Sequence, residues 1–332
     1  MKNGPRVLVV ACRVALTGDK SNNVRIFDAY RKLGYDVDFY GAYKHGRYNK
    51  RDLIMPDFSA YDVIHTNQHL MHEEREHLID MIDSQRSPSS KFICWAFDSC
   101  NPYDPGSERK HKDIKRNCHK FDFFFATDGS YDWSQHGANF VHLFQGVEED
   151  EFVINESIQP IYDTVFTGMV NGRHSPRIQL IQGVSNQFSI ICNRFYREGG
   201  EVKLRQFPRV DKFVPRQYGQ DFCDLYRSAR SALMPLGYDG VKNYWSNRLY
   251  LITATGRPCV VGYVDGIENE FEVGREILTF TDTRDACEKI SFLLNNPDVA
   301  ESIGNAGRKR TLTNYKYSDR IKRIMELVAG ND

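Results

Sequence analysis

The sequence lacks the short signatures of several large enzyme classes. It has no G-x-G-x-x-G and no G-x-x-x-x-G-K-[ST], so a dinucleotide oxidoreductase or a P-loop ATPase loses its main support. Neither H-E-x-x-H nor G-x-S-x-G occurs, so the zinc and serine hydrolases that carry these motifs find no support either. The chemistry of this chain therefore has to be sought in residues that these signatures do not mark.

Cysteine pairs and long apolar runs are also missing. None of the eight cysteines forms a Cys-x-x-Cys pair, and Cys12, Cys94, Cys192 and Cys259 lie in or next to apolar strand-like runs. We therefore expect reduced, buried thiols that act as small hydrophobes, and no metal site. The apolar runs are far shorter than the ~18 residues that a membrane span needs, and the first residues do not form a secretory signal. These absences predict a cytoplasmic protein of a bacterial cell or a phage-infected host.

An excess of charge of one sign is absent as well. The chain has 44 basic and 44 acidic residues, which gives no global attraction to nucleic acid or to an anionic membrane, although a local patch can still provide one. Its composition, 41% hydrophobic and 27% charged, is that of a globular protein. Its 332 residues exceed what one hydrophobic core usually serves, so we expect two domains.

Strands and helices alternate through the first half of the chain. RVLVVAC (6–12) is a continuous apolar run, as expected for a central parallel strand covered on both faces. The segment 21–34 has helical periodicity, with Ser21 or Asn22 as its cap and Gly34 as its end. YDVDFYG (35–41) alternates apolar and polar residues, which is typical of a strand nearer a sheet edge. Continued to about residue 150, this pattern predicts a parallel α/β sheet.

A second α/β series starts near residue 162. The acidic segment 148–160, broken by its last residue Pro160, separates the two series, so we place domains at 1–155 and 156–315 and a final helix at 316–332. We expect two Rossmann-like domains facing across a cleft, with the final helix crossing back to the N-terminal domain. Ligands of such sheets sit at the loops beyond the carboxyl ends of the strands, so we expect the functional residues there.

Two segments of the second series resemble a known family. SNRLYLITATG (246–256) is similar to a helix of the form [NS]-x-R-x-[YF]-E-x-x-x-x-G, and GIENEFEVGRE (266–276) to a segment G-[LI]-x-x-x-F-x-x-G-x-E. Both patterns occur in the carboxyl-terminal domain of GT-B glycosyltransferases, most closely in the group 1, CgeB-like branch. FQGVEEDEF (144–152) and VFTGMVNGRHSPRIQLI (165–181) resemble the hinge of that family and the opening of its second domain. The matching residues of the first two segments are Asn247, Arg248, Tyr250, Gly256, Gly266, Ile267, Phe271, Gly274 and Glu276.

The resemblance implies an activity, but this chain lacks the family's ribose-binding glutamate. It implies transfer of a sugar from a nucleoside diphosphate sugar, such as a UDP-sugar, to an acceptor hydroxyl, with retention at the anomeric carbon and without metal or other cofactor. Where the family has a glutamate for the donor's ribose, this chain has Leu251, and Asn243 replaces the glutamate found eight residues earlier in the wider superfamily. Either ribose is held differently, which we favour, or the donor is unusual, or transfer is lost. The last case would make the chain an inactive nucleotide-sugar-binding or scaffold protein.

The start of the 245–256 helix is the first candidate donor site. Free backbone N–H groups and a partial positive charge at a helix start suit a diphosphate. Lys242 and Arg248 would neutralise the leaving diphosphate, while Asn243, Ser246 and Asn247 would orient oxygens of the donor. The alternative is structural: Ser246 and Asn247 cap the helix, and Arg248 extends into solvent.

A second phosphate site is predicted at 168–177. Gly168 ends a strand and permits close backbone approach, and Arg173 or Arg177 begins the next helix. Surface arginines on a loop are the alternative.

The acceptor side is predicted in the first domain. Asp98 directly follows a buried strand, where a carboxylate would act as general base on an acceptor hydroxyl or stabilise positive charge on the sugar ring. The alternative is a turn cap for Asn101-Pro102. His65 and His69 follow the preceding strand and are lesser candidates, because such histidines are commonly structural.

The nature of the acceptor stays open between a glycan, a small molecule and a DNA base. ERKHKDIKRNCHK (108–120) has six basic residues against two acids, and 194–216 has seven against three, with four aromatic residues interleaved. Basic and aromatic residues together suit nucleic acid, so a hydroxylated base of phage DNA, reached by base flipping, is one possible acceptor. The alternative is a solvated helix and a phosphate-facing loop. The oligomeric state is not predicted.

Overall fold

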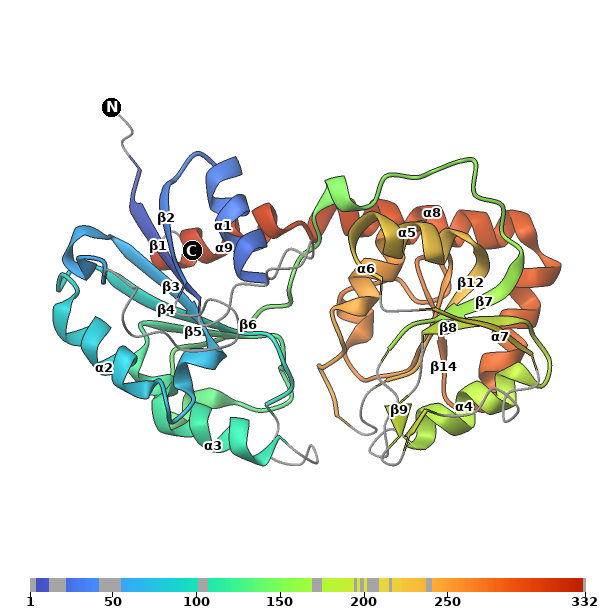
Figure 1. Ribbon diagram of the computed structural model, residues 1–332, viewed down its shortest axis with the longest axis horizontal. Coiled ribbons are helices and arrows are strands. Elements are labelled where there is room, and N and C mark those ends of the chain that lie inside the picture. The colour runs from blue at the N-terminus through green and yellow to red at the C-terminus, as the bar shows by residue number, and fades with distance from the viewer. Residues whose placement is uncertain are drawn as a thin grey trace. The chain divides into compact units, whose positions relative to one another are not determined.

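The chain folds into two compact α/β units, one comprising Met1–Gly146 with Tyr317–Asp332 and the other Val147–Lys316. They are seen in a computed structural model (Figure 1), in which helices and strands alternate along each unit. The structure describes residues 4–11, 22–41, 55–100, 107–168, 175–193, 196–197, 200–201, 209–214, 217–236 and 241–330. None of the helices in these ranges is both long and apolar enough to cross a membrane.

The N-terminal unit is built on a six-stranded parallel sheet of order β2-β1-β3-β4-β5-β6. As the apolar run predicted, β1 is a central strand whose residues after Arg6 are all buried, and β2 is an edge strand that is only partly buried. The elements are β1 (Arg6–Ala11), α1 (Asn22–Lys32), β2 (Asp36–Gly41), β3 (Val63–Asn67), α2 (Glu76–Gln85), β4 (Lys91–Ala96), α3 (Glu108–Asn117), β5 (Phe123–Ala126), β6 (Phe140–His142) and α9 (Tyr317–Val328).

Helices cover both faces of this sheet. Leu78 of α2 and Ile114 of α3 pack in one core cluster, while Ile26 of α1 and Ile321 of α9 pack in the other. Figure 1 shows the two pairs of helices on opposite sides of the sheet. The last helix of the chain therefore completes the core of the unit that the chain builds first.

The C-terminal unit has a second six-stranded parallel sheet, of order β11-β8-β7-β12-β13-β14. α4 and α7 pack together against it, and Figure 1 shows α5 and α6 on the side opposite α4. A two-stranded ribbon, β9 (Tyr196–Arg197) with β10 (Gly200–Glu201), lies outside the sheet. The remaining elements are β7 (Tyr162–Phe166), α4 (Ser175–Ser185), β8 (Ile190–Asn193), β11 (Val210–Val214), α5 (Gly219–Arg227), β12 (Ala229–Met234), α6 (Arg248–Ala254), β13 (Cys259–Gly262), β14 (Leu278–Phe280), α7 (Thr283–Asn295) and α8 (Pro297–Asn314).

Glycine allows α8 to lie directly against the end of α6. A Cβ atom on Gly304 of α8 would stand 2.2 Å from the carbonyl oxygen of Gly256, which no side chain can occupy. Gly256 itself has φ +74° and ends the α6 segment in the left-handed region that favours glycine.

The cysteines are buried thiols, as predicted. The seven that the structure describes are all buried and none is in a disulfide, while Cys12 lies outside the described residues. Burial raises the pKa of Cys118 and of Cys223 to about 11, so these thiols stay protonated at neutral pH.

Candidate active site

The order of the strands in the C-terminal sheet points to one place on its carboxyl edge. From β7 the sheet continues through β8 to β11 on one side, and from β12 through β13 to β14 on the other. In open parallel sheets, ligands bind beyond the strands at the point where the order reverses. Here that point lies beyond β7 and β12, and Gly168 stands two residues after the end of β7.

Two residues predicted separately as donor ligands meet at this point. Nη1 of Arg248, the first residue of α6, lies 3.0 Å from the position that a Cβ atom on Gly168 would take. The ring of Phe166 lies 2.8 Å from the same position, so any larger residue here would have to displace the ring or the guanidinium group. The fold thus brings a guanidinium group to a backbone that carries no side chain, although 80 positions separate the two residues in the numbering.

The positive charge of Arg248 also affects the pKa of a neighbouring side chain. The Tyr226 hydroxyl pairs with the Thr167 hydroxyl at 2.9 Å, just beyond β7. Burial raises the pKa of Tyr226 to about 12, and the nearby positive charge of Arg248 opposes that rise. Positive potential is therefore present at the carboxyl end of β7.

The helix that carries Arg248 is shorter than predicted. It begins at Arg248 and not near residue 245, and it spans seven residues, Arg248–Ala254. Trp245 is buried with its indole N–H directed to the Tyr250 hydroxyl at 3.4 Å, which keeps the preceding segment out of the helix. Because few peptide dipoles are aligned in seven residues, we assign the positive potential to the charge of Arg248 rather than to the helix start.

The other predicted residues of this segment have distinct environments. The Ser246 hydroxyl accepts a hydrogen bond from the backbone N–H of Arg248 at 3.3 Å, as a helix cap would. Asn247 makes no such cap, and its buried Oδ1 has no hydrogen-bond partner among the described residues. Lys242 is exposed. A buried amide oxygen without a donor is costly in a folded protein, so Asn247 is open to a ligand hydroxyl.

Asn243 packs against the glycine-containing segment that follows β13. Its backbone is in the left-handed region, with φ +52°, and its N–H donates to the Asp265 carbonyl at 2.8 Å. Its Oδ1 lies 2.0 Å from the position of a Cβ atom on Gly266, so Gly266 has to be glycine. Asn243 therefore links the segment before α6 to the start of GIENEFEVGRE.

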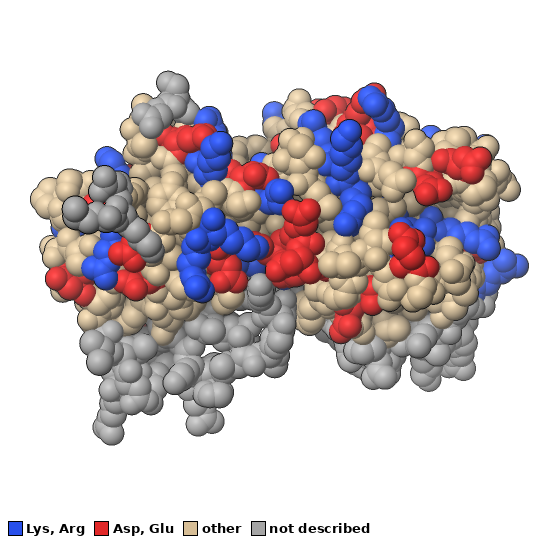
Figure 2. Space-filling view, turned by 90° about the horizontal axis from the view of Figure 1, so that it is seen from above, with Lys and Arg blue, Asp and Glu red and all other residues tan. Residues whose placement is uncertain are grey.

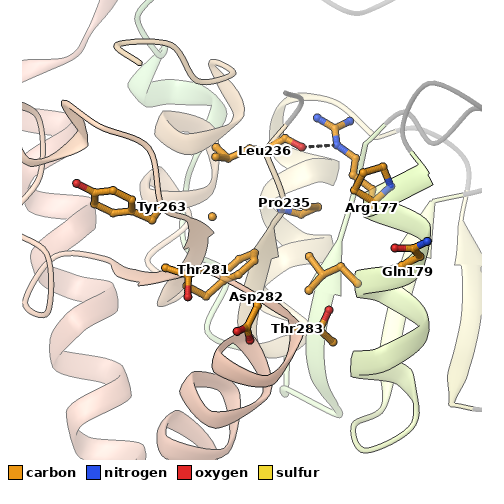
Figure 3. Close-up of a pocket in the computed structure, with 12 residues that line it drawn as sticks. Arg177, Gln179, Pro235, Leu236, Tyr263, Thr281, Asp282 and Thr283 are labelled. Carbon is orange, nitrogen blue, oxygen red and sulfur yellow. Dashed lines mark hydrogen bonds between the residues drawn. The ribbon is translucent and has the colours of Figure 1, made fainter. Parts of the chain in front are cut away.

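A pocket of about 440 Å³ lies further along the same sheet edge (Figure 3). Arg177 of α4 is only 8% exposed and donates from Nε to the Leu236 carbonyl at 2.8 Å, so it is not a surface arginine. This volume is within the range of small-molecule sites. Its lining residues are Pro176, Arg177, Gln179, Leu180, Pro235, Leu236, Gly262, Tyr263, Phe280, Thr281, Asp282 and Thr283.

Most lining residues of this pocket escaped prediction from the sequence. Leu236, Tyr263 and Thr281 each follow one of three neighbouring strands, and no motif marks them. Their only signal is their position one or two residues after a strand of a parallel sheet. Arg173, also predicted for this edge, lies outside the described residues.

On the N-terminal sheet, Asp98 and His69 both lie beyond the carboxyl ends of neighbouring parallel strands, β4 and β3. The Asp98 carboxylate accepts from Lys110 Nζ at 3.0 Å, and its side chain is 49% exposed. Gln68 Nε2 approaches the same oxygen at 3.5 Å. His69 is exposed in a short turn, where its backbone N–H donates to the Asn67 side chain at 2.9 Å. Residues Asn101 and Pro102 lie outside the described residues.

The prediction that His65 follows a strand is wrong. His65 lies within β3. It is 1% exposed, and its Nδ1 lies 3.0 Å from the Tyr30 hydroxyl of α1. Burial lowers the pKa of His65 to about 3, which keeps the imidazole neutral. All five residues of β3, Val63–Asn67, are buried, so His65 belongs to the core and not to an acceptor site.

The basic helix α3 is largely neutralised by acids of the same unit. Arg109 pairs with Glu73 at 2.8 Å, and Arg116 pairs with Glu76 at 2.7 Å. Lys120, just after α3, pairs with Asp80 at 2.5 Å. Figure 2 likewise shows a face of the molecule on which basic and acidic side chains are interspersed. The second basic stretch, 194–216, lies mostly outside the described residues.

Comparison with known proteins adds to this geometry. Residues 175–326 match the family described as "Glycosyl transferase-like". This chain carries a glycosyltransferase domain. The predicted family and enzyme class are thereby confirmed, while the CgeB-like branch stays a prediction. No curated protein sequence matches the chain.

Solved structures similar to this chain confirm the predicted fold, an α/β GT-B architecture. Sucrose-phosphate synthase from Thermosynechococcus elongatus has a TM-score of 0.70 and 11% identity, over 99% of this chain and 100% of the other. HepE from Anabaena, in complex with UDP and glucose, has a TM-score of 0.70 and 10% identity, over 98% and 100%. An alpha-glucosyltransferase in complex with UDP and a 13-mer DNA has a TM-score of 0.65 and 13% identity, over 98% and 100%.

Proposed function

We propose that this protein transfers a sugar from a UDP-sugar to an acceptor hydroxyl, with the donor bound at the carboxyl edge of the C-terminal sheet. The observation that carries this proposal is the guanidinium group of Arg248 beside Gly168, at the point where the strand order reverses. A diphosphate needs close backbone approach and a compensating charge, and arginine's planar fork suits two phosphate oxygens. The complexes of HepE and of the alpha-glucosyltransferase with UDP support the choice of donor.

The remaining residues of this edge take supporting roles in donor binding. The pocket beside Arg177 has the size and the mixed polar and apolar lining that part of a nucleotide needs. Lys242 adds positive charge, and Asn243 and Ser246 hold the segment before α6 in shape. The unpaired Oδ1 of Asn247 accepts from a ribose hydroxyl, which compensates for Leu251 at the position of the family glutamate.

The transfer step follows from this charge arrangement. The bond between the anomeric carbon and the diphosphate oxygen breaks, the diphosphate leaves with its electron pair beside Arg248, and the acceptor oxygen bonds to the anomeric carbon. We propose Asp98, which pairs with Lys110, as the base that takes the acceptor proton. We also propose retention at the anomeric carbon without a metal. NMR of the product's anomeric proton and activity in EDTA test these two points.

A hydroxylated base in duplex DNA is our second proposal, for the acceptor. It is favoured by the alpha-glucosyltransferase whose structure contains a 13-mer DNA. On α3, Lys112 and Lys115 are exposed and have no carboxylate partner among the described residues, so they are available to phosphates. A gel shift of hydroxymethylated duplex DNA at low salt is expected, and weaker binding in a Lys112→Glu/Lys115→Glu variant. No shift at low salt would remove DNA as the acceptor.

The donor proposal is tested by binding and turnover together. We expect UDP and UDP-glucose to raise the melting temperature, and UDP release from UDP-glucose to be measurable without acceptor. Arg248→Ala should weaken UDP binding by at least about tenfold, since a charge-assisted contact to phosphate is lost. Arg284→Ala, which removes an 89% exposed arginine of α7, should leave binding unchanged.

The possible outcomes separate the two functions considered for this fold. UDP-glucose binding with UDP release supports an enzyme. Saturable binding without turnover on any acceptor would identify a nucleotide-sugar-binding protein instead. If neither UDP nor UDP-sugars bind, or if Arg248→Ala binds UDP as the unchanged protein does, the proposed donor site is wrong.

A further inference from the structure

Three arginines converge at the amino edge of the C-terminal sheet, at the ends of the strands opposite to Gly168. Arg227 ends α5 just before β12, Arg257 lies just before β13, and Arg308 lies on α8. A Cβ atom on Gly256 would lie 3.4 Å from Arg308 Cδ and 3.8 Å from Arg227 Nη1, so both side chains border the same small volume. We call Arg227, Arg257 and Arg308 the arginine triad.

The triad has hydrogen-bond partners but little negative charge. Arg257 Nη2 donates to the Arg227 carbonyl at 2.6 Å, and Arg308 donates to the carbonyls of Ala254 and Phe152. Among the described residues, the one carboxylate within 4 Å of the triad is Glu156, 3.7 Å from Arg227 Nη2. The Glu156 side chain is 84% exposed, whereas that of Arg227 is 13% exposed.

Two donor atoms of the triad are buried and unused. Nε of Arg227 and Nε of Arg257 have no solvent exposure and no hydrogen-bond partner among the described residues. Buried arginine is normally paired, and a buried donor without an acceptor is costly. Two donor atoms of the triad therefore lack acceptors in the described part of the chain, and the one carboxylate in contact with it there is largely exposed.

Mutual repulsion contributes to lowering the pKa of two members of the triad. Burial is the main cause that lowers the pKa of Arg257 to about 10, and the charge of Arg227 is the next. Burial also lowers the pKa of Arg308, and Arg227 contributes again. An anion placed among the three side chains would reverse these shifts, since opposite charge favours the protonated form.

We propose that the arginine triad binds a phosphate group, at a site separate from the donor site. A phosphate offers several acceptor oxygens, which would satisfy the unpaired Nε atoms of Arg227 and Arg257, and it matches the fork of arginine. Glu156 lies over Arg227 as an exposed competitor that can swing into solvent when phosphate enters. The backbone of Phe152 and the side chain of Ile154 border the same place, so the bound anion would hold segment 152–156 against α6 and α8.

Inorganic phosphate is the probe for this site. We expect phosphate to raise the melting temperature above that in chloride of equal ionic strength, and titration calorimetry to show saturable binding. Arg227→Gln and Arg257→Gln should each weaken that binding by at least about tenfold, which is the loss of one charge-assisted contact. Arg284→Ala should leave it unchanged, because Arg284 is an 89% exposed arginine of α7 outside both proposed sites.

Glu156→Gln provides a test that does not require removing an arginine. Removing the competing carboxylate while keeping the arginines should tighten phosphate binding several-fold, whereas a purely structural ion pair would predict only lower stability. Titration of UDP into the Arg248→Ala variant tests whether the phosphates of a nucleotide also bind the triad. Competition between UDP and phosphate in that variant would extend the site to nucleotides, whereas independent binding would restrict it to inorganic phosphate.

The results also separate this proposal from the proposed function. Phosphate binding that is lost in Arg248→Ala but kept in Arg227→Gln and Arg257→Gln would overturn the triad site. Failure of UDP-sugars to bind, with phosphate binding intact and sensitive to Glu156, would overturn only the donor site.

Discussion

At the residue scale, the positions that decide this protein's chemistry are defined by what surrounds them and not by their type. Arg177 is a buried arginine on a pocket, Arg248 faces a glycine at the carboxyl end of β7, and Arg257 is buried beside another arginine. Arg284, in contrast, is exposed and bound to a neighbour on its own helix. The roles that we propose for these arginines therefore differ with their burial and their partners.

His65 gives a prediction at this scale. The folded protein holds His65 neutral down to about pH 3, whereas the unfolded chain protonates it near its ordinary pKa of about 6.5. The stabilisation from the buried neutral form is therefore present above pH 6.5 and is lost as the pH falls toward 3. His65→Gln, which keeps an acceptor for Tyr30, should reduce the stability difference between pH 7.5 and pH 5 by about 2 kcal/mol. Urea unfolding at both pH values measures it, and an unchanged difference would contradict the prediction.

At the scale of elements, α6 depends on its contact with α8. The helix is too short to be stable alone, so its position, and with it that of Arg248, depends on packing. Gly304 permits the close approach of α8, and the Thr253 and Thr311 hydroxyls join the two helices at 2.6 Å. Donor binding should therefore be sensitive to changes far from the donor.

Gly304→Ala tests this dependence. Its Cβ atom would meet the Gly256 carbonyl, so α8 has to shift, and we expect a loss of about 2–4 kcal/mol in the free energy of unfolding together with weaker UDP binding. Asn305→Ala, at an exposed position of the same helix, should change neither quantity by more than about 0.5 kcal/mol. Urea unfolding and UDP titration of both variants decide the matter, and a stable Gly304→Ala with normal UDP affinity would refute it.

At the scale of the whole molecule, each of the two units has a hydrophobic core of its own. The first core is completed by α9 at the end of the chain, where Ile321 and Ile324 are fully buried among residues of β1 and α1. The second core lies within Val147–Lys316 and contains the proposed donor site. Binding of UDP to the C-terminal unit, or a mutation in one core, should therefore change the stability of that unit and not of the other.

Ile324→Asp probes this independence. A buried carboxylate in the first core should lower the stability of the N-terminal unit by about 3 kcal/mol or more, while UDP continues to bind the other unit. In calorimetry we expect one transition to fall in temperature and the other still to rise with UDP. Loss of UDP binding at a temperature where the C-terminal unit is folded would contradict the prediction.

The class of the fold and most of its elements could be predicted from the sequence, and so could two residues of the proposed donor site. The apolar run of β1, the alternation of β2 and the glycines that end α1 and α6 are local patterns, and local backbone preference is enough to encode them. The sequence predicts Gly168 and Arg248 as donor-site residues because glycine and arginine have specific uses near phosphate.

Only the tertiary structure decided which residues share a place. The meeting of Gly168 with Arg248, the burial of His65 within β3, the pairing of α3 with acids of α2 and the convergence of the arginine triad all join residues distant in the chain. Such contacts depend on the order in which strands assemble and on which helix covers which face. A single sequence carries no local signal for either, because packing free energy is summed over the whole core.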